Sequence, residues 1–323
     1  MSFNFFWRIF IISIVIPIFN ESKTIPILWD RLHKVISSLE YGIEVIFVND
    51  GSTDDSFEKS YYLHEINKSI IRIITFSRNF GHQNALTAGI DSATGIATIL
   101  MDGDLQDTPE TLPQFIKKWE EGFDVVYATR INRKESLLKR LAFSWFYRIQ
   151  KTLVNFTIPP DSGIFSLMDK KVIDVLISLP ECNRHISGLR GYIGFNQIGI
   201  PVERERRYEG EPRVSIIRLV KLAFDGFFSL SNLPLRIATL VGIIIALTSF
   251  VFSLWILFMK FIGEASPGWA SNLIATFFMG GIQLIFLGII GEYLGRIYDE
   301  NKKRPYYIID QTLGFDKDSN FKQ

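Results

Sequence analysis

Three acidic residues and a glutamine follow an apolar stretch in the first half of the chain. Residues 96–110 read IATILMDGDLQDTPE, so that Asp102, Asp104, Gln106 and Asp107 come after the apolar run. Side chains two residues apart on an extended chain point the same way, so Asp102 and Asp104 can converge on one point. Such a pair suits a hard divalent cation, Mg²⁺ or Mn²⁺, although most isolated Asp-x-Asp sequences are solvated turns.

The elements around this cluster alternate between short apolar runs and helical patterns. Strands are predicted at Ile11–Ile16, Glu44–Val48, Ile70–Phe76, Ile96–Met101 and Asp124–Thr129. Helices are predicted between them, at Ile25–Leu39, Asp54–His64, Gln83–Asp91 and Leu112–Glu121. Continuously apolar strands that alternate with helices indicate an α/β fold with a mainly parallel sheet covered on both faces.

Each of the five predicted strands is followed by a polar cluster. In chain order the clusters read PIFNES, NDGSTDDS, SRNFGHQN, DGDLQD and RINRK. In parallel sheets, ligands bind beyond the carboxyl ends of the strands, where these clusters would gather. Five clusters at one sheet edge indicate a binding site far more strongly than one Asp-x-Asp does.

Composition excludes some classes of protein. The chain has 323 residues and a net charge of +1, which gives no electrostatic case for a nucleic-acid partner. Its single cysteine, Cys182, excludes an internal disulfide and fits a reducing compartment. The apolar N-terminus lacks a small-residue cleavage site, so we interpret its end as the first strand and not as a signal peptide.

Two long stretches near the C-terminus carry no charged residue. They are Ile237–Met259 and Ala265–Gly291, and each is longer than the roughly 20 residues that cross a bilayer as a helix. We therefore predict two transmembrane helices, at about 237–259 and 270–292, although a buried core helix is the alternative. Basic residues flank the pair on its outer sides, which predicts a multi-pass inner (cytoplasmic) membrane protein with both termini in the cytoplasm.

These patterns divide the chain into four parts. Residues 1–214 form a predicted cytosolic domain, with a basic helix at Arg133–Val154, and residues 236–297 hold the two membrane helices. Residues 215–235 carry one polar stripe on an apolar helix, which predicts a helix in the membrane interface, or else an amphipathic helix on the soluble core. Residues 298–323 form a cytosolic tail.

The motifs together resemble a known family. PIFNES, VNDGSTDDS, SRNFGHQNALTAGID, MDGDLQDTPE and the C-terminal GEYLGRIYDENKKRP are similar to the polyprenyl-phosphate glycosyltransferases of glycosyltransferase family 2. The resemblance is to bactoprenol glucosyltransferases first and to dolichyl-phosphate mannose synthases more distantly, and it runs from about Ile12 to Pro305. It implies a Rossmann-like A-type glycosyltransferase domain and a homo-oligomer, in relatives a tetramer.

The resemblance also implies a donor site for a UDP-sugar. Residues that match the family's nucleotide-sugar pocket are Pro17, Asn20, Glu21, Asp50 and Asp102. Those that match its metal and diphosphate site are Asp102, Asp104 and Gln106, with Asp104 expected to be catalytic and Mg²⁺ or Mn²⁺ as cofactor. On the sequence alone, Asp50 could equally be a turn or N-cap aspartate.

An acceptor site for polyprenyl phosphate at the bilayer is implied in the same way. Arginines suit a phosphate headgroup because they bind it bidentately, although a solvated basic face or attraction to anionic lipid explains any single one as well. The candidates are Arg130, Arg133, Arg140, Arg207 and Arg213.

The chain departs from the family at the acceptor motif. Where relatives usually read Gly-Asp-Phe-Arg-Leu, residues 163–167 read GIFSL, so Ile164 replaces the proposed general base and Ser166 the arginine. A phosphate monoester is mostly a dianion at pH 7 and needs positioning more than deprotonation. Asp161 is a candidate to replace the missing carboxylate.

These features bear on three possible functions. The first is metal-dependent transfer of a hexose, with glucose favoured, from a UDP-sugar to undecaprenyl phosphate. The second is a membrane scaffold or partner subunit that binds nucleotide sugar or lipid without transfer, for which Ile164 and Ser166 would be the sign. A processive polysaccharide synthase would need a Gln-x-x-Arg-Trp motif and more membrane spans, and the sequence shows neither.

Overall fold

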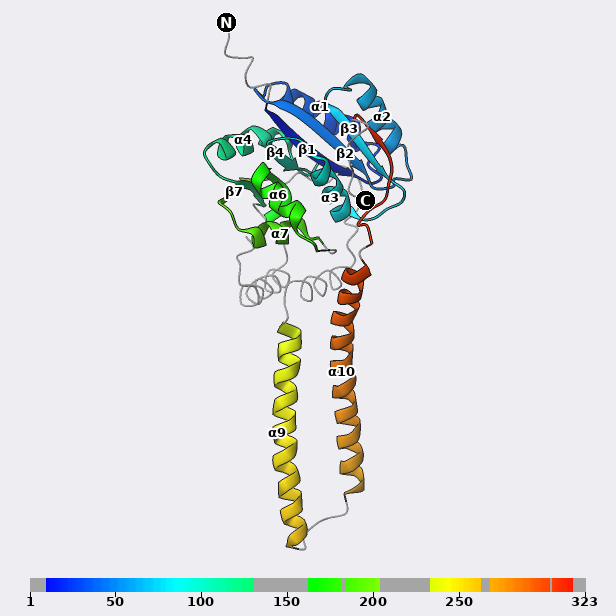
Figure 1. Ribbon diagram of the computed structural model, residues 1–323, viewed down its shortest axis with the longest axis vertical. Coiled ribbons are helices and arrows are strands. Elements are labelled where there is room, and N and C mark those ends of the chain that lie inside the picture. Colours follow the sequence, from blue (N-terminus) through cyan, green and yellow to red (C-terminus); the bar gives the residue numbers. More distant parts are fainter. Residues whose placement is uncertain are drawn as a thin grey trace. The chain divides into compact units, whose positions relative to one another are not determined.

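The computed structural model describes residues 10–130, 162–181, 184–203, 233–262, 268–302 and 304–315. These stretches belong to two compact units. One unit contains a β-sheet with its covering helices and includes the C-terminal segment 304–315, and the other contains two long helices (Figure 1). The predicted basic helix at Arg133–Val154 and most of the predicted interfacial helix at 215–235 lie outside the described residues.

In the described part of the first unit, eight strands form one sheet in the order β7-β5-β6-β4-β1-β2-β3-β8. The strands are β1 Ile11–Ile18, β2 Gly42–Asn49, β3 Ile71–Phe76, β4 Ala97–Leu100, β5 Val125–Arg130, β6 Ser162–Asp169, β7 Gln197–Val202 and β8 Ile309–Leu313. Only β6 and β8 run antiparallel to their neighbours. The prediction of an α/β fold with a mainly parallel sheet is therefore confirmed.

Helices cover both faces of this sheet (Figure 1). One face packs against α1 Thr24–Ile36, α2 Ser56–Ile66 and α4 Leu112–Glu120, the last preceded by the 3₁₀ turn Pro109–Thr111. The other face packs against α3 His82–Ser92, α6 Lys170–Ser178 and α7 Ile186–Ile193. The covering follows from helical periodicity, since Ile25, Leu28 and Leu32 of α1 form one stripe and are almost fully buried.

The central strand β1 shows why the apolar runs are continuous. Ile12, Ile14 and Ile16 belong to the core under α1, whereas Val15 belongs to the core under α3. Both sets are fully buried because side chains alternate between two covered faces. The first five strands begin and end within two residues of the predicted bounds, so their carboxyl ends meet at one edge as expected.

Beyond residue 130 the sheet contains strands that the sequence analysis did not predict. Strand β6 lies between β4 and β5 and runs antiparallel to both, and β7 extends the sheet beside β5. The consecutive strands β4 and β5 are therefore not neighbours in the sheet, and neither are β6 and β7. The insertion places Gly163 and Ile164, at the start of β6, next to the carboxyl ends of the parallel strands.

The second unit contains helices α9 Leu233–Phe261 and α10 Trp269–Lys302. Both extend past the predicted membrane segments. In the described residues, one stretch is long and apolar enough to cross a bilayer, Phe278–Gly295 in α10, while the apolar stretch in α9, Ala238–Phe252, is shorter. Leu247 and Leu284 are more than half exposed, as are many large apolar side chains of both helices.

After α10 the chain returns to the sheet. Strand β8 pairs antiparallel with β3, and Ser77 donates its backbone N–H to the carbonyl oxygen of Ile308. Tyr307 is 4% exposed, stacks on Phe76 with ring centroids 5.0 Å apart, and donates its hydroxyl to Asp91 at 3.1 Å. The segment 304–315 is thus an integral part of the first unit.

Candidate functional site

The acidic cluster forms a tight loop directly after β4. The backbone N–H of Asp102 donates to Asp107 Oδ2 at 3.2 Å, and that of Gln106 donates to Asp104 Oδ1 at 3.1 Å. Leu105 has φ +63°, a conformation that L-residues rarely adopt, and its side chain is buried. The loop is therefore strained at Leu105 while its backbone N–H groups hold the carboxylates in place. Strained backbone of this kind is common at binding sites.

Glycine at position 103 permits close approach of the first strand. A Cβ added to Gly103 would lie 3.0 Å from the carbonyl oxygen of Pro17, at the end of β1. The structure thus places Pro17, a predicted donor-site residue, directly against the Asp102–Asp104 loop.

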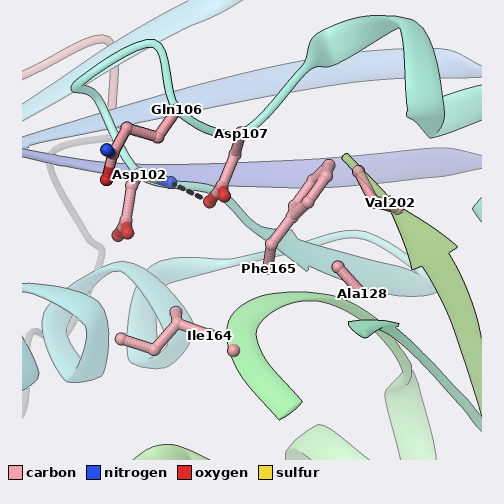
Figure 2. A pocket seen from close by; sticks show the side chains of 8 residues that line it. Asp102, Gln106, Asp107, Ala128, Ile164, Phe165 and Val202 are labelled. Carbon is pink, nitrogen blue, oxygen red and sulfur yellow. Dashed lines mark hydrogen bonds between the residues drawn. The ribbon is translucent and has the colours of Figure 1, made fainter. Parts of the chain in front are cut away.

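A pocket opens beside this loop (Figure 2). It is lined by Asp102, Gln106, Asp107, Ala128, Gly163, Ile164, Phe165 and Val202. These residues come from the loop after β4 and from β5, β6 and β7, so the pocket joins the predicted metal site to the altered acceptor motif. Ile164 supplies a hydrocarbon side chain to this wall, at the position where the resemblance leads one to expect an aspartate.

His82, the first residue of α3, contacts the acidic loop and was not among the predicted site residues. Its Nε2 lies 2.9 Å from Asp102 Oδ1. Burial opposes protonation of His82, but its hydrogen bond to Asp102 and the charges of Asp102, Asp104 and Asp50 outweigh burial and raise its pKa. The available signal was its position in SRNFGHQN, the polar cluster after the third strand.

The donor set suits a hard cation that also binds a ligand. Among the described residues, no group of three or more His, Cys, Asp or Glu side chains is arranged to hold a metal ion. Magnesium, however, is commonly held by one or two carboxylates together with substrate phosphates. Asp102, Asp104 and Gln106 offer two carboxylates and an amide from one loop, and they fit that arrangement.

Asp50 lies at the same edge, but its carboxylate is already engaged. It is 2% exposed, and its oxygens accept the backbone N–H groups of Phe80 at 2.6 Å and Gly81 at 3.0 Å. Burial raises the pKa of Asp50, and these hydrogen bonds oppose the rise. The structure therefore assigns Asp50 to holding the start of α3, and its contact with a nucleotide stays a prediction.

The two remaining donor-site candidates, Asn20 and Glu21, lie in the loop after β1. Asn20 has φ +55°, donates its N–H to Ser52 Oγ and accepts the N–H of Thr53 at 2.8 Å. The N–H of Glu21 donates to Ser56 Oγ at 2.9 Å. Hydrogen bonds thus hold the loops after β1 and β2 together at the carboxyl ends of these strands.

Asp54 holds the same pair of loops, which the sequence did not reveal. Its Oδ1 accepts the Ser56 hydroxyl at 2.5 Å and its Oδ2 accepts the N–H of Ser22 at 3.2 Å. Burial would raise the pKa of Asp54, yet the hydrogen bonds from Ser56 and Ser22 prevail and lower it below 3.8. The ionised form is therefore the stabilising one.

A pH dependence follows for Asp54→Asn. Because the folded-state pKa is lowered, the stabilisation is complete above the ordinary value of 3.8 and disappears as the pH falls through the folded value. We expect the wild type to melt higher than Asp54→Asn at pH 6, with the gap closing towards pH 3. Melting curves across this range test it, with exposed Asp55→Asn as control. A gap that is constant with pH would contradict the assignment.

The acceptor candidates fall mainly outside the described residues. Arg130 ends β5, but its side chain is not among those described. The other candidates, Asp161, Arg133, Arg140, Arg207 and Arg213, lie in the stretches that the structure does not describe. Their roles stay predictions from the resemblance.

Comparison with solved structures supports the fold. Glucosyl-3-phosphoglycerate synthase from Mycobacterium tuberculosis, in complex with Mn²⁺, UDP-glucose and phosphoglyceric acid, is similar with a TM-score of 0.50 and 16% identity. The match covers 68% of this chain and 78% of that chain. At this level of identity the likeness concerns the fold, a Rossmann-like A-type glycosyltransferase sheet.

Sequence relatives extend over nearly the whole chain. A glycosyltransferase of Synechocystis sp. is 41% identical over 307 residues, which is 94% of this chain and 96% of that protein. The bactoprenol glucosyl transferase of Shigella phage SfX is 36% identical over 300 residues, 92% of this chain and 98% of that protein. Residues 13–177 also match the family described as Glycosyl transferase family 2. The resemblance seen in the motifs is confirmed, and the chain belongs to glycosyltransferase family 2.

Proposed function

We propose that this glycosyltransferase moves a hexose, glucose being the first candidate, from a UDP-sugar to undecaprenyl or another polyprenyl phosphate. The observation that carries the proposal is the pocket in which the Asp102–Asp107 loop faces the start of β6 (Figure 2). Carboxylates that could hold a metal ion, which would neutralise the charge of a leaving diphosphate, thus lie beside the residues that match the acceptor motif. Full-length similarity to a bactoprenol glucosyl transferase supports the choice of acceptor and sugar.

The chemistry is an inverting displacement. An oxygen of the lipid phosphate attacks the anomeric carbon, the bond from that carbon to the UDP oxygen breaks, and UDP leaves. Asp102, Asp104 and Gln106 would hold Mg²⁺ or Mn²⁺, which neutralises charge on the departing diphosphate. Pro17, Asn20, Glu21 and Asp50 order the loops around the nucleotide. Because the phosphate is already a dianion, Ile164 does not remove a base that the reaction requires.

The membrane would present the acceptor. We propose that α9 and α10 cross the cytoplasmic membrane, that residues 215–235 lie in the interface, and that both termini are cytoplasmic. The charge-free stretches and the basic residues outside them support this topology. Arg130, Arg133, Arg140, Arg207 and Arg213 would receive the phosphate, Asp161 would replace the missing carboxylate, and the family resemblance suggests a homo-oligomer. Anchoring turns the lipid search into a two-dimensional one.

The deciding experiment offers the purified chain a polyprenyl phosphate with a panel of UDP-sugars. We expect one UDP-hexose to give a lipid product one hexose heavier by mass spectrometry, and none without the lipid phosphate. Absence of product with every donor would reject the proposed reaction.

Metal removal provides a separate prediction. Chelation with EDTA is expected to stop lipid glycosylation, because the diphosphate would leave without charge neutralisation, and added Mg²⁺ or Mn²⁺ is expected to restore it. Product mass after each step gives the readout, and calcium serves as the ion of wrong size. Full activity in excess EDTA would contradict the metal assignment.

A second candidate function rests on Ile164. An apolar side chain in the pocket wall fits a chain that binds a nucleotide sugar or lipid without transferring, as a scaffold or partner subunit. Binding of UDP-sugars without any lipid product would favour it. A large gain in rate in the Ile164→Asp/Ser166→Arg variant would show that the natural motif limits transfer.

A further inference from the structure

A buried arginine lies behind the altered acceptor motif. Arg190, on α7, is 1% exposed and is among the largest fully buried side chains in the described residues. Its guanidinium carbon lies 4.8 Å from the centre of the Tyr127 ring, and its Nη1 donates to the carbonyl oxygen of Gly163 at 3.3 Å. Gly163 itself lines the pocket. The guanidinium is therefore in contact with a residue of the pocket wall.

Part of this guanidinium has no partner among the residues that the structure describes. Arg190 Nε and Nη2 are buried and make no hydrogen bond to any described residue. Burial lowers the pKa of Arg190 to about 10, so the group still carries its charge at pH 7. A buried cation without a counter-charge is costly, and a structure that keeps one usually supplies an anion.

The free nitrogens define the shape of that anion. Nε and Nη2 are the two donors on one edge of a guanidinium, and this edge binds two oxygens of a carboxylate or phosphate at once. The same chain shows the arrangement on its surface, where Arg31 uses Nε and Nη2 to bind the two oxygens of Glu110 at 2.9 and 2.8 Å. Arg190 presents the same edge unused.

Arg190 lies on the face of the sheet toward which the side chain at position 166 points, where the family motif would have an arginine. Ser166 pairs with Tyr127 across β5 and β6, so their side chains lie on the same face of the sheet. Arg190 covers Tyr127 on that face. The short side chain of Ser166, which turns back to bond the Ile164 carbonyl oxygen, leaves this space to a side chain from α7.

We propose that Arg190 supplies from α7 the cation that position 166 does not, and that its Nε and Nη2 bind two oxygens of the acceptor phosphate. The inference rests on the proposed function and adds to it a specificity-determining residue for the acceptor. Ligand entry would then require Gly163 to move aside, because Gly163 lines the pocket and its carbonyl oxygen accepts the hydrogen bond from Arg190 Nη1.

The test compares Arg190→Met and Arg190→Lys with Arg184→Met in the full-length chain. Arg184 is a matched buried arginine, 6% exposed, that donates to the carbonyl oxygens of Ile177 and Leu179. We expect Arg190→Met to lower kcat/KM for polyprenyl phosphate on the order of tenfold to a hundredfold, with the KM for UDP-sugar unchanged. Arg190→Lys should recover part of the loss, and Arg184→Met should lower only the melting temperature.

A second experiment places the arginine at position 166 instead of position 190. The double variant Ser166→Arg/Arg190→Ser should regain much of the acceptor kcat/KM that Arg190→Ser loses. Equal losses for donor and acceptor in Arg190→Met, or no regain in the folded double variant, would overturn the inference.

Direct binding separates this inference from the proposed function. Farnesyl phosphate is titrated in the presence of UDP, and we expect weaker binding to Arg190→Met than to wild type. If wild type binds the probe through Arg190 but forms no product, the proposed function fails and the inference stands. Unchanged binding in folded Arg190→Met would overturn the inference whether or not wild type transfers sugar.

Discussion

Replacement of Asp104 with asparagine is expected to reduce sugar transfer to polyprenyl phosphate on the order of 100-fold or more while the protein stays folded. The substitution removes a charge but keeps the shape. Asp104 Oδ1 accepts the N–H of Gln106 at 3.1 Å, and an asparagine oxygen can accept the same bond, so the loop retains its geometry. The loss would therefore measure how much the carboxylate contributes by holding the metal ion that neutralises the leaving diphosphate.

The measurement is product formation per unit of enzyme at saturating donor and metal, together with a melting curve. Asp30→Asn is the matched control, because Asp30 is an exposed aspartate on α1 and should leave both quantities unchanged. Near-normal transfer in Asp104→Asn would remove Asp104 from the metal site. A collapse of the melting temperature would show instead that its charge maintains the loop.

The second large effect concerns stability. Tyr307→Ala is expected to lower the free energy of unfolding of the first unit by about 3 kcal/mol, the usual cost of deleting a buried aromatic ring. Tyr307 stacks on Phe76 and donates its hydroxyl to Asp91, so the change leaves a cavity and an unpaired acceptor together. The melting temperature should fall by roughly 6–12 °C.

Two further variants separate the causes. Tyr307→Phe keeps the ring and loses only the hydrogen bond to Asp91, so its cost should be about 1 kcal/mol. Tyr62→Ala removes a tyrosine that is 66% exposed on α2 and should change the melting temperature little. If Tyr307→Ala melted like Tyr62→Ala, the segment after α10 would not contribute to the stability of the sheet.

The first half of the fold could be predicted because its signals are local. Each of the first five strands is an apolar run that is followed by polar residues. One short stretch of sequence therefore predicts both where the strand lies and which of its ends faces the site. The apolar stripe of Ile25, Leu28 and Leu32 likewise predicts which side of α1 faces the sheet. Such patterns need no knowledge of the partner strand.

The second half depends on partners that are distant in sequence. The apolar stretch GIFSLM was not predicted as a strand, and nothing within it indicates that it enters the sheet between β4 and β5 in the reverse direction. The site shows the same limit. The motif predicts Asp102 as a site residue. Its contact with His82 could not be predicted, because it depends on how the segments after β3 and β4 meet in space. Arg190 escaped notice because a charged residue on a helix is usually exposed.

The return of the chain to β3 has a consequence for biosynthesis. Strand β3 ends at Phe76 and its partner β8 begins at Ile309, so more than 230 residues separate the two halves of one ladder. The two long helices are therefore an insertion within the sheet domain and not an appendage to it. A ribosome must release nearly the complete chain before the sheet gains its last strand. Completion of the sheet therefore waits until both long helices have been synthesised.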